Sequence, residues 1–170
     1  MTKLKLTLIA SALVVSGSAL AASDGTLGTS SVGESDVTII KDNAVLISDV
    51  NDIDLGAHAA LAADAVESDE VCIFSSTTNY NVTIDSANGG FRLMDGAEEI
   101  PYALTWQADG GSAASVTDGT AITGLAGDNT SLDCSSGTNA TFEVTVASAD
   151  FNAAVPGSYS DTLTLTVAPE

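Results

Sequence analysis

Alternation of apolar and polar residues with a period of two is the feature that most constrains the fold of this chain. It is clearest near the C-terminus, and it recurs at residues 80–84, 100–106 and 142–146. Successive side chains of a β-strand point to opposite faces, so each run predicts a strand with one buried face. One face of the C-terminal run carries Tyr159, Asp161, Leu163, Leu165 and Val167, and the other carries serine and threonine.

Shorter apolar runs and turn residues complete this pattern. Residues 44–47 and 71–74 are continuous apolar runs that favour strands. Between most of the runs, glycine stands next to Asn, Asp or Pro in the sequence, which is typical of turns. Several short strands separated by such turns predict an all-β, immunoglobulin-like sandwich. The Ala-rich residues 57–65 form either a short helical turn or a loop.

Charge excludes two classes of partner. The 170 residues include 23 Asp and Glu against 4 Lys and Arg, which gives a formal net charge of −19. Nucleic-acid binding and polybasic membrane binding both need a cationic surface, so neither partner is expected. The hydrophobic fraction of 45% is too high for a disordered acidic tail and predicts a packed core.

The N-terminus has the order of a secretory signal peptide. Lys3 and Lys5 precede an apolar run at residues 6–15, and Ala19-Leu20-Ala21 follows as a cleavage pattern. The run is about half the length that a membrane-spanning helix needs, which argues against an anchor. We predict a signal peptide at residues 1–21, a mature chain that begins at Ala22, and no membrane insertion.

The predicted secretion affects the expected oxidation state of the two cysteines. Cys72 and Cys134 form an even pair in an oxidising compartment, which favours a disulfide. The alternative is a pair of buried thiols. Two cysteines 62 positions apart and one distant histidine do not make a zinc signature, so we predict no metal site there.

No catalytic group is predicted, and the chain is not expected to be an enzyme or to need a cofactor. His58 has no nucleophile motif beside it, and the adjacent Glu98 and Glu99 point to opposite faces of a strand. An acidic cluster follows the first predicted strand, but it does not fit the EF-hand spacing. A calcium site assembled from separate loops is the remaining metal alternative. The cluster contains Asp49, Asn51, Asp52 and Asp54.

A Gly- and Ser-rich extension at residues 22–42 precedes the domain at residues 43–170. Within it, the odd-numbered residues from 27 to 39 are small or apolar and carry no charge, whereas Glu34 and Asp36 occupy the other parity. We predict an orphan strand here, the alternative being a flexible leader. The uncharged face consists of Leu27, Thr29, Ser31, Gly33, Ser35, Val37 and Ile39.

The C-terminal run at residues 156–170 resembles the ending of the spore coat protein U domain family, which includes secreted pilin subunits of archaic chaperone–usher pili. Residues 52–56, 71–74 and 104–106 are similar to further stretches of that family. The resemblance spans most of the mature chain. One departure is that many members carry a cysteine early in the first strand, where residues 44–48 have none, so the pairing of Cys72 with Cys134 is not part of the resemblance.

The resemblance implies an incomplete sandwich that lacks its last strand. A periplasmic chaperone fills the groove first, and the N-terminal extension of a neighbouring pilin then replaces it at an outer-membrane usher, by β-strand addition. The expected role is a structural subunit of a surface pilus (fimbrium), secreted through the periplasm, that supports adhesion and biofilm formation. The alternative is a monomeric secreted module that binds carbohydrate or calcium and completes its own sandwich.

Overall fold

The computed structural model describes residues 22–132, 135 and 137–170. The predicted signal peptide and Cys134 lie outside the described residues, so the cleavage and the disulfide remain predictions. The chain divides between Lys41 and Asp42 into two units, which are described separately. In the described part of the chain, no helix has the length and apolar character needed to cross a membrane.

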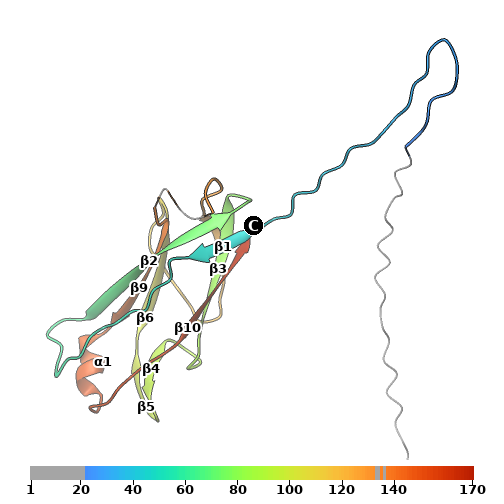
Figure 1. Cartoon of the computed structure of the whole chain (residues 1–170). Coiled ribbons are helices and arrows are strands. Elements are labelled where there is room, and N and C mark those ends of the chain that lie inside the picture. The colour runs from blue at the N-terminus through green and yellow to red at the C-terminus, as the bar shows by residue number, and fades with distance from the viewer. Residues whose placement is uncertain (1–21, 133–134, 136) are drawn as a thin grey trace, which may run out of the picture. The chain divides into compact units, whose positions relative to one another are not determined.

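The domain from Asp42 is a sandwich of antiparallel sheets, as Figure 1 shows. This arrangement confirms the predicted all-β, immunoglobulin-like fold. The larger sheet has the order β1 (Val45–Ser48), β2 (Ala65–Ser75), β9 (Ala140–Val146), β6 (Ala103–Ala108) and β7 (Ala114–Ser115). The smaller sheet has the order β10 (Leu163–Pro169), β3 (Asn79–Ser86) and β8 (Ile122–Ala126). A separate hairpin joins β4 (Arg92–Asp95) to β5 (Glu98–Pro101).

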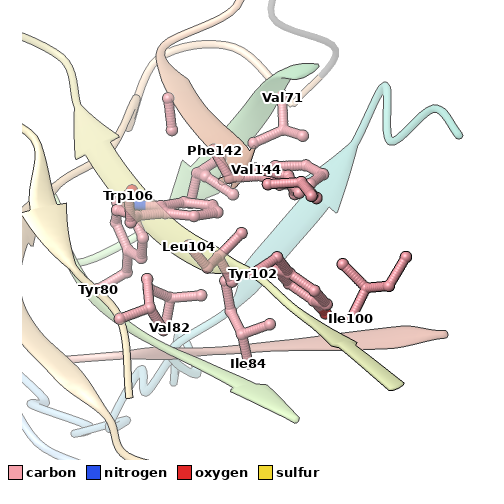
Figure 2. Packing of buried hydrophobic residues seen from close by; sticks show 14 residues of the cluster. Val71, Tyr80, Val82, Ile84, Ile100, Tyr102, Leu104, Trp106, Phe142 and Val144 are labelled. Atoms are coloured by element: carbon pink, nitrogen blue, oxygen red, sulfur yellow. The ribbon is translucent and has the colours of Figure 1, made fainter. Parts of the chain in front are cut away.

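The core lies between the two main sheets and is filled from alternating positions of their strands (Figure 2). Trp106 stacks on Phe142 and meets Tyr80 edge to face, and its indole N–H donates to the Tyr80 hydroxyl at 3.1 Å. Aromatic pairs of this geometry add stability beyond the area that they bury. The remaining buried apolar side chains come mainly from β2, β3, β6 and β9.

Three local predictions need correction or completion. The alternation at residues 100–106 does not form one strand, because the chain leaves β5 at Pro101 and begins β6 at Ala103. The C-terminal strand begins at Leu163 instead of Tyr159. Residues 57–64 form a loop, and the helix among the described residues is α1 (Ser148–Ala153), which the sequence reading did not predict.

The extension, residues 22–41, forms no regular strand. Ser23 and Glu34 exchange two backbone hydrogen bonds of 3.1 and 3.0 Å and close a loop between them. Leu27, Val37 and Ile39 are 105%, 95% and 93% exposed. The apolar side chains of the predicted orphan strand are therefore available for contact in this structure.

Candidate functional site: a groove beside the open edge of β10

The site is built around two strand edges that lack a partner. Among the described residues, β1 is hydrogen-bonded only to β2, and β10 only to β3. In an antiparallel pair, alternate residues direct their N–H and C=O groups to the partner strand and the others direct them away. The bonded pairs include Thr162 with Ala87 and Glu170 with Asn79, so the even-numbered residues of β10 face β3.

The backbone groups of Leu163, Leu165 and Val167 therefore point to the open edge of β10. The same parity argument applies to β1, where Ala44 bonds to Ser76, so Val45 and Ile47 point to its open edge. The side chains of all five residues are only half buried, although they pack against the core. The two edges thus combine unpaired main-chain groups with incompletely covered apolar side chains.

A groove runs beside the open edge of β10, between residues 50–58 and residues 157–165. It has two compartments of about 450 and 470 Å³, which share Ile53, Leu55, Leu93 and Asp161 in their lining. The floor of the first compartment includes Tyr102, Phe142 and Val144, and that of the second includes Ile100 and Val146. These floor residues belong to the hydrophobic core, and most are labelled in Figure 2. The groove is therefore a place where the core is open on one side.

The strands β1 and β10 lie close to each other. Some of their Cα atoms lie within 8 Å, yet the two strands are not hydrogen-bonded to each other. A strand inserted between two others would separate them by about 9.5 Å, twice the spacing of paired strands. An added strand would therefore have to move β1 and β10 apart by at least about 1.5 Å where they lie closest.

Asp161 links the start of β10 to the groove floor. Its Oδ2 accepts hydrogen bonds from the Tyr102 hydroxyl and from the Ser86 hydroxyl, both at 2.7 Å. Burial raises the pKa of the Tyr102 hydroxyl, and the hydrogen bond to Asp161 and the negative charges of Asp161 and Asp118 raise it further. The neutral hydroxyl therefore acts as the donor to the carboxylate at neutral pH.

The acidic cluster that follows β1 forms part of one groove wall. The backbone N–H and the side-chain amide of Asn51 donate to the carboxylate of Asp69, at 2.8 and 3.1 Å. Asp54 accepts a hydrogen bond from the N–H of Gly56 at 2.8 Å, which closes a turn. Among the described residues, no group of three or more His, Cys, Asp and Glu could hold a metal ion. The structure thus gives these side chains roles in fixing the wall.

The remaining predicted site residues are dispersed. His58 lies in the second compartment, with its Nε2 2.8 Å from the carbonyl oxygen of Leu55 and its ring edge-on to Phe151. Cys72 is buried in β2. Sequence reasoning did not identify the wall at residues 50–58 or the contact between Tyr102 and Asp161. Ile53 and Leu55 are apolar residues at alternate positions, and both are half buried in the structure. This alternation is the sequence signal that could have located the wall.

Comparison with known proteins supports the fold. No protein-family model matches the chain, and no curated protein matches it. A chain from the solved structure of a chaperone–tip adhesin complex, described as vital for synergistic activation of CFA/I fimbriae biogenesis, is similar with a TM-score of 0.53 and 16% identity. The match covers 74% of this chain and 42% of that chain. The likeness shows a fold that a fimbrial complex also contains.

Proposed function

We propose that this chain is a structural subunit of a secreted surface pilus, assembled by chaperone–usher donor-strand exchange. The observation that carries the proposal is the groove between residues 50–58, which follow β1, and residues 157–165. There the core is open beside the edge of β10, which, like the outer edge of β1, has no partner strand among the described residues. An exposed strand edge is a template for pairing with another chain, and edges of this kind are normally covered or blocked. A strand supplied by another molecule would cover this one.

The added strand would pair with the open edge of β10. The main-chain groups of Leu163, Leu165 and Val167 would supply the hydrogen bonds, and the half-buried side chains around them would receive alternate side chains of the incoming strand. Pro169 has no N–H, so the ladder of donors from β10 would end at Val167. This edge gives the main-chain affinity that β-strand addition requires.

The extension of a neighbouring subunit has the pattern of such a strand. In one register its odd-numbered residues, among them Leu27, Val37 and Ile39, would face the groove. A shift by one residue would instead direct Glu34 and Asp36 toward the apolar floor. A buried carboxylate without a partner costs several kcal/mol or takes up a proton. The favoured register is therefore the one that directs the uncharged odd-numbered residues into the groove.

The proposal names the partners and the location. A periplasmic chaperone would cover the groove during transit, an outer-membrane usher would organise the exchange, and neighbouring pilin subunits would occupy the groove at the cell surface. The C-terminal resemblance to the spore coat protein U domain family and the likeness to a fimbrial complex both support this assignment. The subunit would support adhesion and biofilm formation and would catalyse no reaction.

The test is secretion of the full chain with and without a chaperone of this type, followed by size determination. Val37→Asp should abolish polymers and leave the chaperone complex intact, because the substitution affects only the donor. Thr38→Asp, one residue further on and of opposite parity, is the matched control and should still form polymers, because it places no charge on the apolar floor. Equal polymer formation by both variants would exclude residues 27–39 as the donor. A wild-type chain that is a stable monomer without a chaperone would favour the self-complemented binding module.

A further inference from the structure

The groove that the proposed function uses is bordered by carboxylates. Asp52 and Asp161 line the first compartment, and Asp54 and Asp161 line the second. Asp95 lies beside the same opening, because its Oδ2 accepts a hydrogen bond of 3.1 Å from the N–H of Ser158, a lining residue. An incoming strand would therefore meet apolar side chains on the floor and negative charge at the rim.

Little positive charge offsets this rim. Residues 42–170 contain a single Lys or Arg, and that residue, Arg92, forms an ion pair with Glu99 at 2.9 Å and donates to the carbonyl of Gly89. His58 contacts the carbonyl oxygen of Leu55. Partial burial raises the pKa of the Tyr159 hydroxyl in the groove wall, and the negative charges of Glu98 and Asp95 raise it further.

The chain's own extension carries the same sign of charge. Residues 22–41 contain three carboxylates and one lysine, a net charge of −2, whereas residues 42–170 contain twenty carboxylates and one arginine, a net charge of −19. Two of the extension's carboxylates, Glu34 and Asp36, occupy the parity that would point outward at the rim. Like charges placed together at an interface oppose association and slow the encounter.

We propose that the occupant favoured by this groove is a cationic extended strand from a second protein, with apolar residues at alternate positions and Lys or Arg at the positions between them. The inference rests on the proposed function, since it assumes that the groove accepts a strand. The apolar positions would cover the floor, and the basic positions would meet the exposed Asp52, Asp54 and Asp95 at the rim. A strand of this chemistry associates with the groove faster than the acidic extension of another copy of this chain.

Three labelled peptides test the inference against the mature chain carrying Val37→Asp, which disables its own donor. The first peptide has the sequence of residues 27–41, and the second carries Glu34→Lys and Asp36→Lys. The third peptide carries Val37→Asp in addition to the two changes of the second. This substitution places a charge among the apolar alternate positions. Association rates are measured by fluorescence anisotropy at low and at high NaCl concentration.

The second peptide should associate at least about 10-fold faster than the first at low salt, because opposite charges steer the encounter. The advantage should fall below about 3-fold at high salt, where charges are screened. Asp52→Asn with Asp54→Asn in the chain should reduce the advantage, while the amide oxygens preserve the turn contacts. The third peptide should bind at least about 10-fold more weakly than the second.

Each other outcome has a defined meaning. Equal association rates of the first two peptides at low salt would overturn the inference and leave the proposed function standing, because both would still occupy the groove. Binding of the third peptide as tightly as the second would also overturn it, since charge alone would then explain the binding. If none of the peptides binds, both the inference and the proposed function are wrong.

Discussion

Removal of the Asp161 carboxylate provides a sensitive test of how the groove is held. Its Oδ2 accepts two hydrogen bonds of 2.7 Å, from the hydroxyls of Tyr102 and Ser86. Tyr102 is 8% exposed, so this residue has little access to water. Asp161→Ala therefore leaves a buried donor without its acceptor and also disconnects the start of β10 from the floor.

The expected loss follows from these two contacts. A hydrogen bond to a charged group contributes about 1.5–3 kcal/mol. Ser86 Oγ also lies 2.8 Å from the carbonyl oxygen of Gly90, an alternative acceptor that reduces its share of the loss. We expect Asp161→Ala to lower the free energy of unfolding by about 3–5 kcal/mol and Asp161→Asn, which keeps an acceptor oxygen, by about 1–2 kcal/mol. Tyr102→Phe should cost about 1.5–3 kcal/mol.

Urea unfolding followed by the fluorescence of Trp106, the chain's one tryptophan and a buried residue, measures these losses. Tyr102→Phe combined with Asp161→Ala should cost less than the sum of the two single changes, because both remove one shared contact. Asp85→Ala, at an exposed position of β3, is the control and should change stability by no more than about 0.5 kcal/mol. A loss below about 1 kcal/mol for Asp161→Ala would refute the role assigned to this carboxylate.

Three further predictions concern the core, the cysteines and the N-terminus. Burial raises the pKa of Tyr80 to about 12, so the folded state holds this proton more tightly, and stability should be complete below about pH 10 and fall between pH 10 and 12. Thermal unfolding across this range should show a shallower fall for Tyr80→Phe. The predicted bond between Cys72 and Cys134 closes a loop of roughly 60 residues and should contribute about 4 kcal/mol, so reduction should lower the urea midpoint. N-terminal sequencing of secreted protein should begin at Ala22, and a retained Met1 would contradict cleavage after Ala21.

The sequence pattern predicted the sandwich well because its strands carry a strong alternation. β3 and β9 each bury one parity and expose or half-expose the other, and β10 half-buries one parity and exposes the other over its first four residues, as the period of two requires. The pattern failed at residues 100–106, since alternation does not record a change of pairing partner. Here the N–H of Tyr102 bonds to the carbonyl of Phe91, and the chain passes from the hairpin to the larger sheet.

Other features had weak signals for physical reasons. Helix α1 is six residues long, so it is too short to show a helical period. The first half of β2 contains Glu67, Asp69 and Glu70, residue types that are depleted in strands, and this hid an element that begins at Ala65. The groove itself depends on which edges lack a partner, and pairing between distant segments is not encoded in any local pattern.

The acidity of the chain and the openness of its groove bear on the same physical problem. A molecule with an unpaired edge and a half-covered core is at risk of pairing with its own copies. The −19 charge of residues 42–170 makes any two copies repel each other, which slows their encounter at low ionic strength. The repulsion acts over about 8–10 Å in physiological salt, so it acts before the strand edges touch. The same field attracts a cationic strand, and charge can therefore disfavour uncontrolled pairing while it promotes capture by a basic partner.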